Sequence, residues 1–350
     1  MAKRRDVIRY GFGILGTVAA ADVLAACAPT AVLAPPSASP LPATPSPLPP
    51  PETKTIRMVI GACDLPIFAA ERNLRDEGFT DVQFSDSAAV PALTGGKADL
   101  VTMFVTTLAV NVEAGVPLLG LGGLHTGCAQ VWAPKSVATM KDLVGRTVVV
   151  RSKAPTDNTY AYIAIGLKNA GVDPSSVNFV VQPEADLTKM YLDGKSDALF
   201  LAAQNTFAFQ TNPANTGHVV LDQAMEAPWS REVCCVLATT TDWAKANPAA
   251  AKRALRAIYR AADSIPTDRA DVAKASTDAG LFGGAKSVAV VRGAANMVPY
   301  EWRTYDLAES TRFHAKLLNE VGLLKMTPDE AVTRATDLRF SRQLQSEVIR

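Results

Sequence analysis

The chain has 350 residues, of which 48% are hydrophobic and 20% charged, and its formal net charge is +1. A sequence of this length can bury one large hydrophobic core or two medium ones. Because there is no basic surplus, we do not expect a nucleic-acid partner.

The N-terminus has the pattern of an export signal. The first ten residues, MAKRRDVIRY, contain four basic side chains, and a short apolar run then leads to Cys27. Asp22 interrupts this run, which is too short to cross a bilayer. We predict a signal peptide over residues 1–26. The stretch "RRDVIR" favours twin-arginine export, with an ordinary Sec signal as the alternative.

A proline-rich segment follows Cys27. The letters "LAAC" resemble a bacterial lipobox, which implies lipid attachment at Cys27. Ten prolines lie between residues 28 and 51. Proline-rich chains are stiff and extended, so these residues can span on the order of 70 Å. We therefore expect residues 27–53 to be a lipid anchor and tether that holds a folded part at the extracytoplasmic face of the cell membrane.

The folded part begins with a strand–loop–helix pattern that occurs twice. "TIRMVIGACDLPIFAAERNLRDEGF" starts with a β-rich run, and a loop and a helix follow. "RTVVVRSKAPTDNTYAYIAIGLKNAGV" repeats this order, with Thr156 or Asp157 as the helix cap. Units of this kind build open α/β sheets.

A shorter repeat indicates two related halves. "TGGKADLVTMF" at 94–104 aligns with "LDGKSDALFLA" at 192–202. In each, a glycine provides the left-handed turn that ends a helix, and a buried strand follows. We interpret the lysine and aspartate of each repeat as solvated turn residues. The repeat predicts two lobes built on one plan.

Four cysteines besides Cys27 are present: Cys63, Cys128, Cys234 and Cys235. They do not have the CxxC spacing of common metal sites. Export would permit their oxidation, but neighbouring cysteines rarely form a disulfide with each other. We interpret Cys234 and Cys235 as small apolar residues of a buried strand rather than as a redox pair.

Several segments together resemble one family. In chain order these are "PIFAAERNLRDEGFTDVQF", "ALTGGKADLVTM", "VEAGVPLLGLGGLH", "VATMKDLVGRTVVV", "LKNAGVDPSSVNFV", "YLDGKSDALF" and "DWAKANPAAAKRALRAIYRAADSI". Their order and spacing over residues 54–345 resemble the substrate-binding proteins of nitrate/sulfonate/taurine-type ABC importers.

The resemblance implies an α/β, two-lobed type 2 periplasmic-binding-protein fold with a central hinge and a ligand cleft. Lobe 1 would comprise residues 54–126 and 239–350, and lobe 2 residues 127–238. Strands near "AQVWAP" and "REVCCVLATT" would cross between the lobes and form the hinge.

Cleft residues can be predicted from the strand ends. In open α/β sheets, ligands bind beyond the carboxyl ends of the strands, where helix N-termini offer free N–H groups. Four such loops and one tryptophan give the predicted ligand-binding set: Asp64, Phe104, Thr106, Ser152, Thr156, Asn158, Gln204, Asn205 and Trp229.

Each of these residues has a structural alternative. Asp64 and Thr156 could be helix caps, Phe104 could be a core residue, and Trp229 could pack between the lobes. We interpret His125 as an ordinary loop histidine.

The expected function is non-catalytic. The motifs GxSxG, HExxH and GxxxxGK[ST] are missing from the sequence. We expect a monomer that closes over a small molecule and docks on an ABC permease, while a separate ATPase subunit hydrolyses ATP. No cofactor and no metal are expected. The alternatives are a lipoprotein sensor without transport and, less favoured, an enzyme like the thiamine-pyrimidine synthases. The ligand stays open between an oxyanion or sulfonate and a planar pyrimidine, flavin or aromatic acid.

Overall fold

The computed structural model describes residues 48–347. The signal peptide, Cys27 and most of the tether predicted above lie outside these residues. Within 48–347, no helix combines the length and the apolar character that a membrane span requires.

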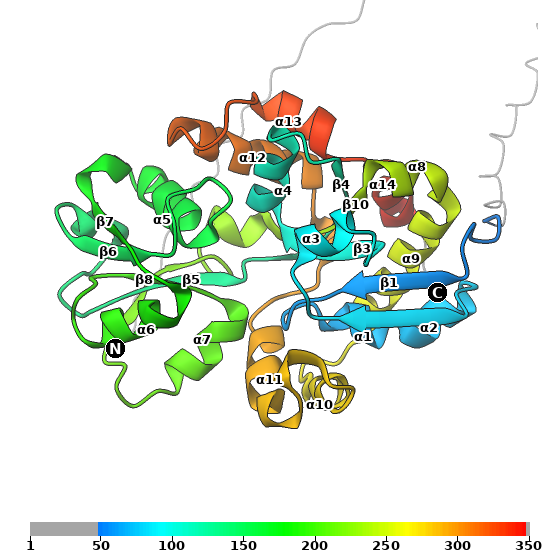
Figure 1. The fold of residues 1–350 in the computed structure, drawn as a ribbon, viewed down its shortest axis with the longest axis horizontal. Helices are drawn as coiled ribbons and strands as arrows, with labels where there is room; N and C mark the ends of the chain where they lie inside the picture. The colour runs from blue at the N-terminus through cyan, green and yellow to red at the C-terminus, as the bar shows by residue number, and fades with distance from the viewer. Residues whose placement is uncertain (1–47, 348–350) are drawn as a thin grey trace, which may run out of the picture. The chain divides into compact units, whose positions relative to one another are not determined.

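The first sheet has five strands in the order β2-β1-β3-β10-β4 (Figure 1). Strand β1 is parallel to β2 and β3, whereas β10 is antiparallel to both β3 and β4. The late strand β10 therefore lies between two early strands. The bounds are β1 Thr55–Val59, β2 Asp81–Ser85, β3 Leu100–Phe104, β4 Leu118–Thr126 and β10 Val233–Thr240.

The second lobe has its own strands, shown in green in Figure 1. Its three-stranded sheet has the order β8-β5-β9, and β6 and β7 form a parallel pair beside it. The bounds are β5 Ala129–Ala133, β6 Thr147–Val150, β7 Asn178–Val181, β8 Leu199–Ala202 and β9 His218–Asp222. The five-stranded sheet of one lobe and the two smaller sheets of the other confirm the predicted two-lobed α/β fold.

The chain crosses between the sheets at 127–128 and returns through 223–232. "AQVWAP" and "REVCCVLATT" thus contribute strands β5 and β10 inside the sheets, and β10 belongs to the first sheet rather than to lobe 2. The two connections touch at Gly127, whose φ is +29°. A Cβ there would lie 2.1 Å from the carbonyl oxygen of Gln223, so only glycine fits without a shift.

Helices cover the sheets and join the lobes. Helix α12 packs on α4 of the first lobe and on α5 of the second, and α11 packs on α7. The helices of the first two-thirds of the chain are α1 Leu65–Ala69, α2 Glu71–Asp76, α3 Ala89–Thr94, α4 Val105–Glu113, α5 Asn158–Asn169, α6 Glu184–Leu192 and α7 Ala203–Gln210. The later helices are α8 Thr241–Ala246, α9 Pro248–Ser264, α10 Ala270–Asp278, α11 Val288–Asn296, α12 Leu307–Glu320, α13 Pro328–Ala335 and α14 Arg339–Ser346.

The end of the predicted tether is attached to α9. The Glu52 carboxylate accepts hydrogen bonds from the backbone N–H groups of Ala249 and Ala250, at 2.9 and 2.8 Å. Arg253 of α9 donates to the carbonyl oxygens of Leu48 and Pro49. The negative charge of Glu52 thereby lies at the N-terminus of α9, where the helix dipole favours it.

The Gly-Lys-x-Asp turns occur as predicted, but Asp99 is buried rather than solvated, and Asp197 is partly buried. Gly96 and Gly194 have φ values of +65° and +70°. Asp99 is buried and accepts from the backbone N–H of Arg57 at 2.8 Å and from its guanidinium. Asp197 accepts from the N–H of Thr147 at 3.1 Å. Each aspartate binds the start of the neighbouring strand, which explains the repeat physically. The two lysines are exposed.

Candidate functional site

A cavity of about 420 Å³ lies at the carboxyl ends of β1, β2 and β3, and residues of both lobes line it. The first lobe contributes most of the wall, and the second contributes Asn158 and Gln204 from the first turns of α5 and α7. Its polar and sulfur-containing lining residues are Cys63, Asp64, Asp86, Ser87, Thr102, Met103, Thr107, Cys128, Asn158, Gln204 and Cys235. The cavity therefore lies at the edge of the sheet that the carboxyl-end rule singled out.

Four of the nine predicted ligand-binding residues line this cavity: Asp64, Phe104, Asn158 and Gln204. Thr107 lines it in place of its neighbour Thr106, which is buried. The Thr107 hydroxyl donates to Oδ1 of Asn158 at 3.1 Å, and this hydrogen bond joins α4 of one lobe to α5 of the other.

The other predicted residues lie elsewhere. Ser152 and Thr156 are in the loop before α5, and Asn205 is exposed on α7; none of them lines the cavity. Trp229 is buried, with its ring 5.2 Å from that of Phe313, centroid to centroid. Trp229 therefore has the packing role that the sequence analysis gave as the alternative to ligand binding, and its partner is Phe313 of α12.

Asp64 has a different role from the helix cap considered above. Its side chain makes no capping hydrogen bond to α1. It accepts instead from the backbone N–H of Gly61 at 2.9 Å and from the Thr102 hydroxyl at 2.5 Å. Its other oxygen lies 3.0 Å from Nε2 of His125. Burial raises the pKa of the Asp64 carboxyl.

His125 is a strand residue of β4, not the loop histidine that we expected, and it is fully buried. Its Nδ1 lies 3.0 Å from the carbonyl oxygen of Thr126. Burial by itself lowers the pKa of His125, but the contacts with Asp64 and Cys63 outweigh it and raise that pKa. Asp64, which lines the cavity, is therefore paired with a buried histidine behind it.

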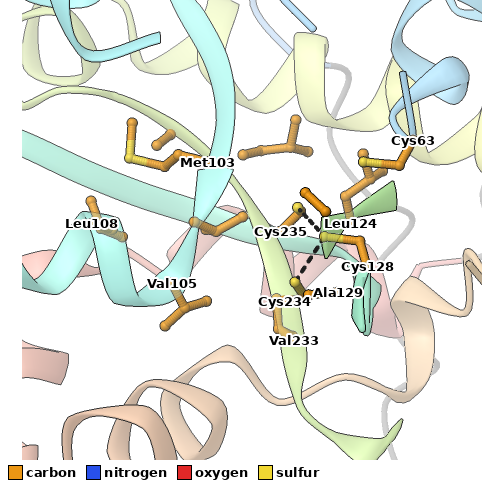
Figure 2. Packing of buried hydrophobic residues seen from close by; sticks show 14 of the residues in the cluster. Cys63, Met103, Val105, Leu108, Leu124, Cys128, Ala129, Val233, Cys234 and Cys235 are labelled. Carbon is orange, nitrogen blue, oxygen red and sulfur yellow. Dashed lines mark hydrogen bonds between the residues drawn. The ribbon is translucent and has the colours of Figure 1, made fainter. Parts of the chain in front are cut away.

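The four cysteines lie close together, and three of them, Cys63, Cys128 and Cys235, line the cavity. Sγ of Cys128 lies 3.0 Å from Sγ of Cys234 and 3.5 Å from Sγ of Cys235 (Figure 2). All four are buried free thiols. The predicted burial of the adjacent pair is confirmed, whereas their meeting with Cys63 and Cys128 could not be read from sequence spacing.

The described lining of the cavity contains acidic side chains but no basic ones. None of the described residues that line it is a lysine or an arginine, and its ionisable carboxyl groups are Asp64 and Asp86. Arg151, which directly follows β6, binds the carboxylates of Asp157 at 2.7 Å and Glu184 at 3.1 Å. Asp86 and Ser87 follow β2, so the carboxyl-end rule would have found them had it been applied to that strand.

Several helices begin at this edge, including α3, α4, α5 and α7. Asp157 caps α5 by accepting from the N–H of Thr159 at 2.9 Å; the sequence predicted Thr156 or Asp157 for this role. Helices α4 and α7 have no side-chain cap. The first N–H of α7, that of Ala203, donates to the carbonyl oxygen of Cys128 at 2.7 Å, whereas the next N–H groups of a helix have no intrahelical partner and can face an acceptor atom of a ligand.

Comparisons with known proteins agree with this fold. The alkanesulfonate-binding protein SsuA of Xanthomonas axonopodis pv. citri, solved with bound MOPS, has a TM-score of 0.63 at 16% identity, covering 82% of this chain and 99% of its own. The nitrate-binding protein NrtA of Synechocystis PCC 6803 gives 0.63 at 16% identity, with 84% and 89% covered.

The aliphatic sulphonate-binding protein SsuA of Escherichia coli gives a TM-score of 0.63 at 15% identity, covering 82% of this chain and 93% of its own. No curated protein matches the sequence. The profile of the family described as NMT1/THI5 like matches residues 81–268, more than half of the chain. The chain belongs to the NMT1/THI5-like family, and its two lobes have the fold of periplasmic binding proteins.

Proposed function

We propose that this protein is an extracytoplasmic, lipid-anchored receptor that captures a small solute in its inter-lobe cleft and delivers it to an ABC importer permease. The observation that carries the proposal is the cavity of about 420 Å³, which takes its lining from both lobes. A ligand there contacts residues on each side of two chain connections, so binding favours a closed arrangement of the lobes. Family membership and the named structural neighbours support the same role.

The lining residues favour a neutral or cationic solute over an oxyanion. An anion in the cavity would lie near Asp64 and Asp86 without a lysine or arginine among the described lining residues. His125 lies 3.0 Å from Asp64 and offsets its charge, so the lack of a basic side chain disfavours an anion more than direct repulsion does. The uncapped N-termini of α4 and α7 suit an uncharged acceptor atom such as a carbonyl oxygen. The nitrate and sulfonate ligands of the neighbours are therefore not proposed for this chain.

Catalysis is not part of the proposal. A cysteine nucleophile needs a base whose ring nitrogen faces the thiol while the other nitrogen faces an orienting group. In His125, Nδ1 is 3.0 Å from the Thr126 carbonyl and Nε2 is 3.0 Å from Asp64, so both nitrogens already have oxygen partners.

A sensor without a permease would use the same cleft. Solute uptake by vesicles that contain the permease and ATPase separates sensing from delivery.

The test is a thermal-shift screen of the full chain against nitrate, alkanesulfonates, pyrimidines, riboflavin, aromatic acids and organic amines. A ligand at 100 times its dissociation constant stabilises by about 2.7 kcal/mol. For about 300 folded residues the unfolding entropy is ~0.6 kcal/mol per kelvin, which gives a rise in Tm of about 4 °C. We expect neutral or cationic compounds to produce the shift; a shift with nitrate or sulfonates alone would overturn the proposed ligand charge.

The hit then tests the cleft residues. Asn158→Ala and Gln204→Ala each remove a lining polar group and should weaken binding by roughly 5- to 10-fold, without lowering the Tm of the unliganded protein. Asn205→Ala is the matched control, because Asn205 neighbours Gln204 on α7 but does not line the cavity. Equal effects of Gln204→Ala and Asn205→Ala would place the ligand elsewhere.

A further inference from the structure

Four cysteines and one histidine meet at the floor of the cleft, although they come from three distant parts of the chain. Cys63 follows β1, and His125 and Cys128 lie at the crossing from β4 to β5. Cys234 and Cys235 are in β10. Figure 2 shows Cys128 between the two cysteines of β10, with Cys63 on the side of the β1 loop.

Four of these five residues present a compact set of ligand atoms. The sulfurs of Cys63, Cys128 and Cys235 and a ring nitrogen of His125 lie within 4.8 Å of one another, and all four residues are buried. In a tetrahedral site with metal–sulfur bonds of about 2.3 Å, neighbouring ligand atoms are roughly 3.8 Å apart. Side-chain movements on the order of 1 Å would therefore bring the set to coordination distance.

The histidine has one of the two partners that a metal ligand requires. Ligating histidines donate the N–H of one ring nitrogen to a carbonyl or carboxylate, and the other nitrogen binds the metal. In this chain Nδ1 is 3.0 Å from the carbonyl oxygen of Thr126, and Nε2 has the Asp64 carboxylate at 3.0 Å. A cation at Nε2 replaces the proton there and displaces Oδ1 of Asp64, whose other oxygen keeps its hydrogen bonds from Gly61 and Thr102.

Packing alone does not explain this group. Buried cysteines do behave as small apolar residues, but a fully buried aspartate and histidine beside them are costly to desolvate. Cys63, Cys128 and Cys235 also line the cavity, so a small cation can reach them from the cleft. Since the described lining residues include two carboxyl groups and no basic side chain, the cavity favours a cation.

We propose that Cys63, Cys128, Cys235 and His125 bind one thiophilic d¹⁰ cation, Zn²⁺ or Cu⁺, at the floor of the cleft. Thiolate and imidazole ligands in a tetrahedral arrangement select these ions over Mg²⁺ or Ca²⁺. The metal forms bonds to sulfur and to Nε2, and each coordinating thiol, together with Nε2, releases its proton to solvent. No oxidation occurs. This inference rests on the proposed function for its biological meaning and deepens it by naming a metal cation as a ligand of that cleft.

The experiment is an anaerobic metal titration of the full chain, purified in reductant and freed of metal. Co²⁺ serves as the spectroscopic probe for Zn²⁺, because thiolate coordination gives it a near-ultraviolet charge-transfer absorption. We expect one Co²⁺ per chain, displaced by one Zn²⁺, and proton release on binding. Cu⁺ is titrated in parallel against a competing chelator, and the relative affinities decide between the two ions.

Variants then identify the ligands. Cys63→Ser, Cys235→Ser and His125→Gln should each weaken Zn²⁺ binding more than 100-fold, and Asp64→Asn by 10- to 100-fold. Cys234→Ala and Cys27→Ala are the matched controls and should bind as the unaltered chain does. Circular dichroism confirms folding. For any variant that unfolds, the remaining ligand variants and Asp64→Asn carry the test.

The proposal is overturned if no stoichiometric metal binds, if the three ligand variants bind as tightly as the unaltered chain, or if Cys234→Ala loses binding equally. It is also overturned if thiol counting shows that Cys128 and Cys234 form a stable disulfide in the native protein. The solute screen is read separately on metal-free protein. Failure of the solute screen with intact metal binding refutes only the organic-solute part of the proposed function, and the reverse result refutes only the metal site.

Discussion

Glu77 provides the sharpest test of how the first lobe is held together. This glutamate follows α2, and its carboxylate is buried to 4% side-chain exposure. It accepts hydrogen bonds from Arg256 at 2.6 Å through both of its oxygens and from Arg253 at 2.9 Å. Because both arginines belong to α9, this one carboxylate ties α2 and the end of the tether to the same helix.

Glu77→Ala should lower the free energy of unfolding by about 3–5 kcal/mol, since it leaves the charges of Arg253 and Arg256, both partly buried, without their carboxylate partner. With an unfolding entropy of ~0.6 kcal/mol per kelvin for about 300 residues, Tm should fall by about 5–8 °C. Glu71→Ala is the matched control: Glu71 is in α2 and pairs with Arg75, but both side chains are nearly half exposed. Its loss should cost less than about 1 kcal/mol.

The assay is calorimetric unfolding of the two variants beside the unaltered chain. A Tm for Glu77→Ala within 1 °C of that for Glu71→Ala would refute the reasoning, because it would mean that the buried pair is not stronger than the exposed one. A fall in Tm that is equally large at high salt supports a buried ion pair, since screening acts mainly on exposed charges.

Three further predictions concern other parts of the fold. Burial raises the pKa of the Glu52 carboxyl, but hydrogen bonds from the N–H groups of α9 outweigh burial and lower that pKa. The ionised carboxylate therefore stabilises the fold above pH ~4.3, the pKa in the unfolded chain, and this stabilisation is lost as the pH falls through the lower pKa of the folded chain. Glu52→Gln should thus cost up to about 1 kcal/mol at pH 7 and nothing at pH 2, as checked by urea unfolding at both values. In the same assay, Asp99→Asn should lower the free energy of unfolding by about 1–3 kcal/mol and Asp197→Asn by less than about 1 kcal/mol, because only Asp99 is fully buried. Equal losses of stability in the two variants would contradict this difference in burial. Gly127→Ala should lower the free energy of unfolding by at least about 1–3 kcal/mol, because the new Cβ would clash with the backbone of residue 223. Gly145 also has a positive φ but has open space around it, so Gly145→Ala should cost less. A larger fall in Tm for Gly145→Ala would contradict the geometry of the crossing.

The features that could be predicted from sequence are local ones. Left-handed glycines after helices, the Asp157 cap and the strand–loop–helix order each depend on a few neighbouring residues, and all are present. The Gly-Lys-x-Asp repeat predicted two lobes, and the resemblance added their boundaries and the hinge. Asp99 was misjudged because its partner, Arg57, is 42 residues away in sequence, on a parallel strand.

The site was only partly predictable for the same reason. Strand ends located Asp64, Phe104, Asn158 and Gln204, since each follows its own strand. The cysteine cluster depends on β10, which returns from the second lobe to lie between β3 and β4. No spacing rule connects residues 63, 128 and 235, because the pairing of these strands is a property of the whole fold.

The polar groups of the cleft favour opposite ligand charges. The N-termini of α4 and α7 carry partial positive charge, but each is worth only about 0.3–1 kcal/mol to an exposed anion. Asp64 is buried beside His125, which offsets its charge, and Asp86 is exposed, so that solvent and salt screen it. The described lining residues include no lysine or arginine, and therefore no full positive charge faces an anion there. Arg151, which follows β6, binds the carboxylates of Asp157 and Glu184 instead.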